Sequence, residues 1–476
     1  MADKKKLEFY GGEWVSFLPF VVFLALIVVT TLMWGSISDG ALWLPAFLAL
    51  IIAFFFVKDK RHYAEVIIEG MASKEAITPV VCWLFAGVFS RILRSSGLAA
   101  AIAGLAAGIG VGPALFTVIT FIAACLFATA SGTGFGTIAA AMAVLYPAGV
   151  ALGCHPGLLA GIIISGAIFG DNLAPVSDTT ICSATSQGVD VPGVVRSRLK
   201  YAAVSAGATI VIAVILSLVL GSNGIAMDAN LSYDPMAFFM LIAVVITIVV
   251  AIKTGDIIIA TTLGTVSGGV IGVLTGQFDF LQIDAADPTK GALIAVHGEG
   301  LDRTVDGILQ TGLSSMLQVC ILALLLFGSI AIMRAGGGDV RLLNALGSVA
   351  KTAKGAEVVT SFMVIILSPI MGLNAPAILA VGPSFAKPLS EKHGISPYRT
   401  ANLLDAQSNT LVYAMPWVPG MIYTLSFASG TSAPLTAAQV TPFVIYGYVL
   451  LVVMFASIFL GIGRHDGEDR LAAKAR

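Results

Sequence analysis

Long apolar runs separated by short polar segments follow one another along almost the whole chain. The hydrocarbon core of a bilayer is about 30 Å thick, and an α-helix needs about 20 mainly apolar residues to cross it. Two stretches, 112–190 and 356–425, are too long for one span and are interrupted by polar residues, so we expect the chemistry there. The plain runs that predict transmembrane helices are residues 16–34, 41–57, 78–94, 201–220, 235–252, 256–275, 311–333 and 440–462.

The distribution of lysine and arginine predicts how the chain crosses the membrane. Short cytoplasmic loops are enriched in these residues, and they gather here in segments 4–6, 58–61 and 196–200. Segments 221–234 and 277–306 are acidic, so we assign them to the outside. On this assignment Arg196, Arg198 and Lys200 lie in a cytoplasmic loop.

These assignments are consistent only if each interrupted stretch contains a re-entrant hairpin. Residues 112–152 would enter and leave on the outside and residues 356–386 on the inside, with apices at 131–137 and 371–376. Irregular backbone at this depth is tolerated where it is buried in protein or lines water. The predicted fold is an all-α polytopic membrane protein with about ten full spans, two hairpins and both termini in the cytoplasm.

The order of the elements indicates an inverted repeat. Residues 69–71 open one unit on the inside and residues 306–308 open another on the outside, and each unit continues with a span, a surface segment, a hairpin and an interrupted helix. Inverted repeats with discontinuous helices are typical of secondary transporters. The predicted units are an N-terminal two-helix hairpin (1–64), repeat 1 (65–200, with hairpin 112–152 and broken helix 157–190), connecting scaffold helices (201–305), repeat 2 (306–425, with hairpin 356–386 and broken helix 398–425), and the last span with a cytoplasmic tail (426–476).

The first broken helix contains the run GDNLAPVSDTT at residues 170–180. Pro175 lacks an amide hydrogen and clashes with the preceding turn, so it should unwind the helix and free backbone carbonyls. Oxygen ligands suit hard cations such as Na+, and we assign Asp171, Asp178 and Asn172 as its ligands. The alternative is an extramembrane loop, where such residues are common in turns, but the apolar run 158–169 argues against it. The candidate binding residues here are Asp171, Asn172, Ser177, Asp178, Thr179 and Thr180.

A second polar break lies at the equivalent place in the other half, with Pro416 interrupting an otherwise apolar stretch. The alternative is a helix start at which Asp405 or Ser408 caps unpaired backbone amides. Paired broken segments are nevertheless expected of a repeat transporter. The candidate binding residues are Asp405, Gln407, Ser408, Asn409 and Thr410 at this break, Ser131, Thr133 and Thr137 at the first apex, and Asn374 at the second. The glycines of the first apex could instead serve close helix packing.

Composition narrows the class of protein. The 476 residues are 57% hydrophobic and 11% charged with a net charge of −1, far more apolar than soluble domains. A nearly neutral chain offers no basic face for nucleic acid. The five cysteines have no CxxC spacing, so neither a disulfide framework nor a zinc site is predicted, and no cofactor is expected.

The run Phe169–Thr180 resembles the signature of the NhaC family of Na+/H+ antiporters, which is close to FGDNLSPISDTT. This chain departs from it at Ala174 and Val176, and residues 404–410 also resemble that family. The resemblance implies the fold of the ion transporter superfamily, with a scaffold, a moving transport domain and often a homodimer. NhaC-like proteins also include carriers of organic solutes such as malate/lactate exchangers.

The predicted function is secondary active Na+/H+ antiport by alternating access. Such a carrier needs a carboxylate that holds either ion but not both, and Asp171 and Asp178 are the natural pair. The partners are then the bilayer of the cell membrane, which is the inner membrane in a bacterium, Na+ and H+. The alternative is a Na+-coupled carrier of an amino acid or small organic acid; with no buried Arg or Lys expected, a dianion is disfavoured. An enzyme with a Mg2+-diphosphate site would need a DDxxD run, which is absent, and a channel needs a continuous polar path.

Overall fold

The computed structural model describes residues 6–34, 43–132, 134–175, 177–220, 234–254, 256–283, 291–298, 302–341 and 350–466. The described chain is mostly helical. The helices of its first part are η1 (Glu13–Phe17), α1 (Leu18–Trp34), α2 (Trp43–Phe56), α3 (Lys60–Met71), α4 (Lys74–Ser95), α5 (Leu98–Gly108), α6 (Pro113–Ser131), α7 (Gly134–Ala151), α8 (Pro156–Leu173), α9 (Asp178–Gln187) and α10 (Val191–Leu220). The central elements are η3 (Pro235–Phe239), α11 (Met240–Thr254), α12 (Ile257–Leu274), β1 (Asp279–Ile283), β2 (Ala292–His297), β3 (Thr304–Asp306), α13 (Ile308–Ser314) and α14 (Leu317–Ala335). The last part contains α16 (Ala353–Met371), α17 (Asn374–Val381), the π-helical turn η5 (Gly382–Ala386), α18 (Lys387–Lys392), α19 (Pro397–Leu411), η6 (Val412–Ala414), α20 (Pro419–Ser429), α21 (Ala437–Val440), η7 (Thr441–Phe443) and α22 (Ile445–Leu460).

Six helical stretches of the described chain are long and apolar enough to cross a membrane, or seven if the bent pair 437–443 and 445–460 is one span. Two of them, residues 156–187 and 397–429, contain the predicted breaks. Several predicted spans, among them 41–57 and 256–275, correspond to apolar helices of 10–17 residues. The chain is therefore a multi-pass membrane protein, and the count of ten full spans stays a prediction.

Each half of the chain contains a helical hairpin followed by a broken helix. In the first half α6 and α7 meet at Gly132, which has a left-handed φ of 68°. In the second half α16 ends at Gly372, also at a φ of 68°, and α17 follows directly. Glycine adopts this conformation without the steric penalty that a Cβ brings. Both predicted apices thus have the glycine that a tight reversal requires.

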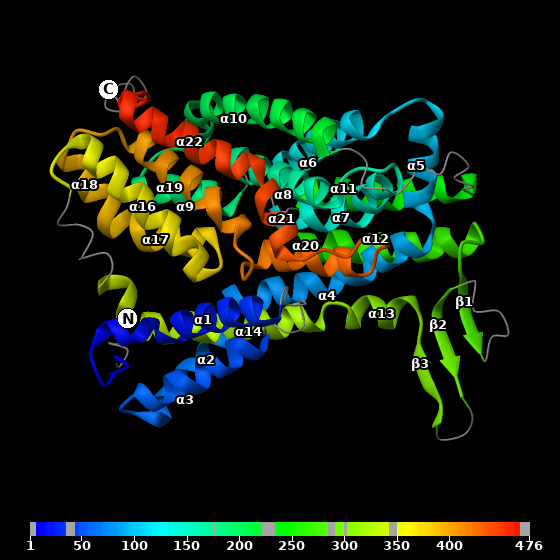
Figure 1. Ribbon diagram of the computed structural model, residues 1–476, viewed down its shortest axis with the longest axis horizontal. Helices are drawn as coiled ribbons and strands as arrows, with labels where there is room; N and C mark the ends of the chain where they lie inside the picture. The colour runs from blue at the N-terminus through cyan, green and yellow to red at the C-terminus, as the bar shows by residue number, and fades with distance from the viewer. Residues whose placement is uncertain are drawn as a thin grey trace.

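Figure 1 shows how these parts are arranged. The hairpin of α16 and α17 lies toward the left end, beside α9 and α19, whereas the hairpin of α6 and α7 lies toward the right, beside α8. The two ends of the chain lie at the left, and the small sheet of β1, β2 and β3 projects at the right. In that sheet β1 pairs with β2 in parallel and β3 pairs with β2 antiparallel.

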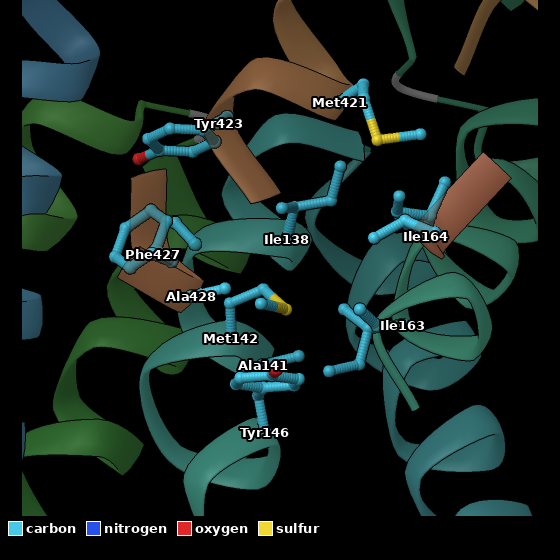
Figure 2. Packing of buried hydrophobic residues seen from close by; sticks show 14 of the residues in the cluster. Ile138, Ala141, Met142, Tyr146, Ile163, Ile164, Met421, Tyr423, Phe427 and Ala428 are labelled. Carbon is cyan, nitrogen blue, oxygen red and sulfur yellow. The ribbon is translucent and has the colours of Figure 1, made fainter. Parts of the chain in front are cut away.

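The interior between the first hairpin and the second broken helix is closely packed. Figure 2 shows α7 side chains such as Ile138 and Met142 facing Ile163 and Ile164 of α8 and Phe427 of α20. All five are buried. The hydroxyl of Tyr146 in α7 donates to the carbonyl of Ala433 at 2.6 Å, which satisfies the one polar group that this tyrosine buries. This packing joins the two halves of the chain.

A second buried contact ties the second hairpin to the C-terminal helix. Glu357 of α16 accepts from Arg399 of α19 at 2.9 Å and from Arg464, after α22, at 2.7 Å. Glu357 and Arg399 are fully buried, and Arg399 also donates to Ser457 of α22 at 2.9 Å. A buried ion pair of this kind is destabilising to break, because one charge is left without a partner.

The structure adds elements that the hydropathy pattern does not predict. The predicted acidic loop 277–306 contains the three-stranded sheet, and the segment between residues 58 and 77 contains the helix α3. The predicted cytoplasmic loop around 196–200 is wrong: these residues lie inside α10, which begins at Val191. Their helical spacing turns Arg198 inward while Arg196 and Lys200 stay outside the core.

Candidate functional site

The first helix break positions Asp171. α8 ends at Leu173 and α9 begins at Asp178, with Pro175 in the turn between them, as its missing amide hydrogen favours. Asp171 is 5% exposed. Ser177 donates to its Oδ1 at 2.7 Å, and Tyr413, at the second break, donates to its Oδ2 at 3.1 Å. Of the residues in the described part of the chain, no Lys, Arg or His forms an ion pair with Asp171.

Hydroxyl groups surround this carboxylate. The oxygens of Ser177 and Thr179 lie 2.9 Å apart, and Thr179 also donates to the backbone carbonyl of Asp171 at 3.3 Å. All three residues are buried. The break therefore collects a carboxylate, two hydroxyls and a carbonyl in one buried place, which is an oxygen environment suited to a hard cation.

Asp178 differs from Asp171 in its access to solvent. Its side chain is exposed, and its Oδ1 accepts from the amide of Thr179 at 2.9 Å. It lines a cavity of about 910 Å³ between α4, α9 and the second hairpin. The other residues that line this cavity include Lys74, Cys82, Trp83, Phe135, Cys182, Arg334, Asp339 and Pro376. Asp178 is thus the acid of the motif that solvent reaches.

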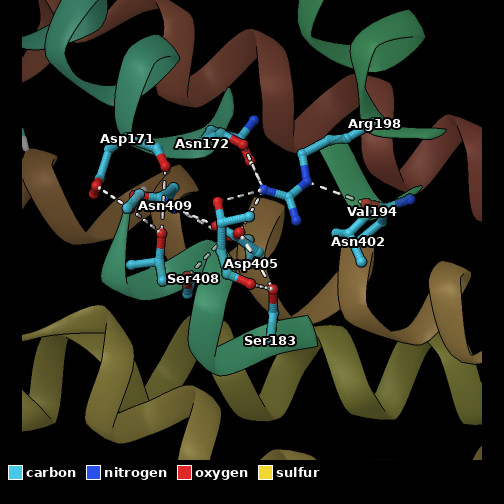
Figure 3. Close-up of polar contacts among 12 residues, drawn as sticks. Asp171, Asn172, Ser183, Val194, Arg198, Asn402, Asp405, Ser408 and Asn409 are labelled. Carbon is cyan, nitrogen blue, oxygen red and sulfur yellow. Dashed lines mark hydrogen bonds and ion pairs between the residues drawn. The ribbon is translucent and has the colours of Figure 1, made fainter. Parts of the chain in front are cut away.

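The second cluster is centred on Asp405 of α19 and is drawn in Figure 3. Arg198 of α10 forms an ion pair with the Oδ2 of Asp405, and both side chains are fully buried. Asn409 donates to the Oδ1 of Asp405 at 3.0 Å, and Ser183 of α9 donates to Oδ2 at 3.4 Å. The carboxylate of Asp405 therefore has a fixed cation, which Asp171 does not have among the described residues.

Arg198 also reaches the first break. Its Nη1 donates to the backbone carbonyl and to the Oδ1 of Asn172, and to the hydroxyl of Thr180 at 3.3 Å. The Nδ2 of Asn172 faces Tyr446 at 3.4 Å. The side-chain oxygen of Asn172, which is predicted to join Asp171 and Asp178 as a Na+ ligand, thus accepts a hydrogen bond from Arg198 in this structure.

The apex of the second hairpin contacts this cluster through an amide pair. The Nδ2 of Asn374 donates to the Oδ1 of Asn409 at 2.5 Å, and both side chains are buried. Ser408 and Thr410 donate to carbonyls one turn back in their own helix, at 2.8 Å each. Gln407 is fully buried and, among the described residues, neither polar atom of its side chain has a partner. Pro416 lies between η6 and α20, at the break itself.

The apex of the first hairpin lies against the second break. A Cβ added to Gly134 would stand 2.6 Å from the hydroxyl of Tyr413, so only glycine allows this approach. Thr137 is buried in α7. The side chain of Ser131 and the whole of Thr133 lie outside the described residues.

Sequence reasoning missed Arg198, Tyr413 and Ser183, and the expectation of a site without a buried Arg is wrong. The sequence does contain a pattern that predicts burial of Arg198. Polar groups recur at helical spacing on one buried face of an apolar helix, at Arg198, Tyr201, Ser205 and Thr209. Tyr413 carries no comparable signal, because it follows the second break and reaches Asp171 only through the fold.

Comparison with known proteins relates the chain to antiporters. Residues 12–221 match the model of the Na+/H+ antiporter family. The chain is 25% identical to the Na+/H+ antiporter NhaC of Alkalihalophilus pseudofirmus over 90% of its own length and 92% of that protein. The chain is similar to the NhaC antiporters over most of its length. The resemblance drawn from residues 169–180 is therefore confirmed.

The chain is also similar to two antiporters of organic solutes. The chain is 24% identical to the malate-2H+/Na+-lactate antiporter of Bacillus subtilis, over 61% of its own length, and it spans 62% of that protein. It is also 24% identical to the arginine/ornithine antiporter ArcD of Halobacterium salinarum, over 72% of its own length and 71% of that protein. Relatives of this NhaC-like chain thus include antiporters with different substrates.

Proposed function

We propose that this protein exchanges Na+ for H+ at Asp171, with Asp178 as the solvent-facing acid, by alternating access. The observation that carries the proposal is the state of Asp171: a buried carboxylate held by Ser177 and Tyr413 without a cationic partner among the described residues. A charge buried in this way is costly unless it is paired. Either a proton or a sodium ion removes the cost, and the two cannot occupy the carboxylate together. Competition between them is sufficient for antiport.

The surroundings of Asp171 supply what Na+ needs. Ser177 and Thr179 offer hydroxyl oxygens, and broken helices with free carbonyl ends are how transporters coordinate small cations. Only one carboxylate of this group, Asp178, faces the cavity of about 910 Å³, so it is the natural first point of contact for an ion. Thr179 links the two acids, because its amide donates to Asp178 and its hydroxyl donates to the backbone carbonyl of Asp171.

The cavity supports an inward-facing state. It lies beside a second cavity of about 800 Å³, which Lys6 and Glu13 line near the N-terminus and which shares Arg334 and Pro376 with the first. The opposite side, where α7 packs on α20, is filled by the side chains in Figure 2. With the N-terminus in the cytoplasm, Asp178 is open to the cytoplasm and closed to the outside. Alternating access then requires the two hairpins and the two broken helices to shift against the remaining helices, as inverted repeats allow.

The test is transport in proteoliposomes, following 22Na+ uptake and internal pH together. In the wild-type protein an outwardly directed proton gradient should drive 22Na+ uptake, and the interior should become more alkaline as protons leave. Asp171→Asn and Asp178→Asn should each lower both signals at least a hundredfold, whereas the matched change Asp302→Asn, at an exposed acid near the sheet, should not. Wild-type rates in the Asp171 variant would show that the ion binds elsewhere.

A second candidate function is exchange of a small organic solute coupled to Na+. The cavity is far larger than an ion requires, and its wall carries Lys74 and Arg334 as well as Asp178 and Asp339. Opposite charges on one wall suit a zwitterion such as an amino acid, and apolar Trp83 and Phe135 could receive its side chain. Uptake of labelled amino acids and dicarboxylates, measured in the same vesicles with and without Na+, decides between the two functions.

A further inference from the structure

A single nitrogen atom, Nη1 of Arg198, lies among four oxygen atoms from three helices. Two are the Oδ2 of Asp405 and the backbone carbonyl of Asn172. The others are the Oδ1 of Asn172 at 3.4 Å and the hydroxyl of Thr180 at 3.3 Å. This nitrogen carries two hydrogens, so the four oxygens share them in bifurcated hydrogen bonds. Four oxygens thus converge on one positively charged group.

The four oxygens have the chemistry of a sodium site. They are a carboxylate, a backbone carbonyl, a side-chain amide and a hydroxyl, which are the ligand types that hard cations take. The carbonyl of Asn172 is free because α8 ends one residue later, at Leu173. Every contributing residue is buried, and the guanidinium is brought in by α10, a helix outside the two breaks.

The corresponding acid in the first half, Asp171, has no arginine beside it among the described residues. Asp171 precedes its helix break as Asp405 precedes the second, and its partners are the hydroxyls of Ser177 and Tyr413. Within the described chain, the two buried carboxylates of the paired breaks therefore differ in one respect: one has a covalently tethered cation and the other has none.

We infer that the guanidinium of Arg198 permanently occupies the cation position at Asp405, so that the protein holds one exchangeable cation, at Asp171, where two equivalent positions exist. The guanidinium is attached to α10 through its own side chain, so it cannot leave the site in exchange for a proton or a sodium ion. Arg198 is a positioning residue that sets the number of ions bound. The inference rests on the proposed function for the assignment of Asp171, and on the Arg198 contacts alone for Asp405.

The test is a count of bound 22Na+ per purified chain at saturation, by equilibrium dialysis in detergent. Wild type should bind one ion and Asp171→Asn none. Arg198→Met, which removes the tethered cation and leaves the oxygens, should bind two. Arg198→Lys keeps the charge and should bind one, as the matched control.

A variant that removes both charges of the ion pair serves as the control for folding. Arg198→Met leaves Asp405 unpaired, so it should melt at a lower temperature in choline and recover in Na+. The double variant Arg198→Met/Asp405→Asn removes both buried charges together, and it should bind one ion, with the same melting shift in Na+ as wild type.

Two results would overturn the inference: a folded Arg198→Met protein that binds no more 22Na+ than wild type, or a double variant that has lost the single wild-type ion. Failure of the proposed function gives a different pattern. In that case the wild-type protein binds no ion and Arg198→Met binds one. Asp171 is then not the ion site, and Asp405 is still a position that Arg198 fills.

Discussion

At the scale of single residues, the two buried aspartates near the two helix breaks have different partners. Asp171 is held by hydroxyl donors, and Asp405 by a guanidinium, an amide and a hydroxyl. A carboxylate that accepts neutral hydrogen bonds can still exchange its proton or ion, whereas one in a buried ion pair is fixed by the cost of separating the charges. The chemistry of each break is thus decided by what faces the acid.

Tyr413 tests this difference directly. Its hydroxyl donates to Asp171 at 3.1 Å, and a hydrogen bond to a charged group contributes about 1.5–3 kcal/mol. We expect Tyr413→Phe to fold normally and to weaken Na+ binding by roughly 10- to 100-fold, which a 22Na+ titration measures. The control is Tyr448→Phe, because that hydroxyl donates to the carbonyl of Thr441 at 2.7 Å, away from the site. Equal affinities in wild type and Tyr413→Phe would mean that the ion does not bind at Asp171.

The residues of the first break could be predicted because they are neighbours in sequence. Asp171, Ser177 and Thr179 stand within nine positions, and Pro175 marks the break between them. Arg198 and Tyr413 could not be predicted in the same way, since they lie 207 and 242 residues from the acids they contact. Such contacts depend on how helices pack, and charge counting then favoured a loop for Arg198, because most arginines near apolar runs do lie in loops.

At the scale of elements, the approach of the first hairpin to the second break depends on the absence of a side chain. Gly134 begins α7 at the point where Tyr413 reaches Asp171. The pattern of loops and breaks predicts the hairpins themselves, but no local pattern encodes the contact between an apex and the opposite half.

Gly134→Ala should therefore displace Tyr413 from Asp171. The added Cβ would lie 2.6 Å from the tyrosine hydroxyl and 3.3 Å from its ring carbon Cζ, and overpacking of this kind costs about 1–3 kcal/mol. We expect a lower melting temperature and at least tenfold slower 22Na+ exchange. Gly207→Ala is the matched control, because nothing lies within 4 Å of its added Cβ and alanine is favoured over glycine in a helix by roughly 0.5–1 kcal/mol. Unchanged exchange in Gly134→Ala would contradict the role given to this contact.

At the scale of the whole molecule, the two hairpins lie toward opposite ends in Figure 1. The span pattern predicts this arrangement only in outline. The sheet in the acidic loop and the helix α3 escape a hydropathy criterion, because it measures length and composition and not packing.

Labelling from the two sides of the membrane tests the arrangement. Ile109, after α5, is 70% exposed, and Glu391 in α18 is also exposed at the other end of the molecule. In a variant without the five native cysteines, Ile109→Cys should react with an impermeant maleimide from outside intact cells, and Glu391→Cys only in inverted vesicles. Reaction of both from one side would exclude an inverted arrangement of the hairpins.

The large cavity has a consequence for the reactivity of the protein. Cys82 of α4 and Cys182 of α9 both line it and are half-buried, whereas Cys125, Cys154 and Cys320 are buried. A small thiol reagent that enters the cavity can therefore reach either of these two sulfurs. An adduct at either position would narrow the space beside Asp178 and should slow transport.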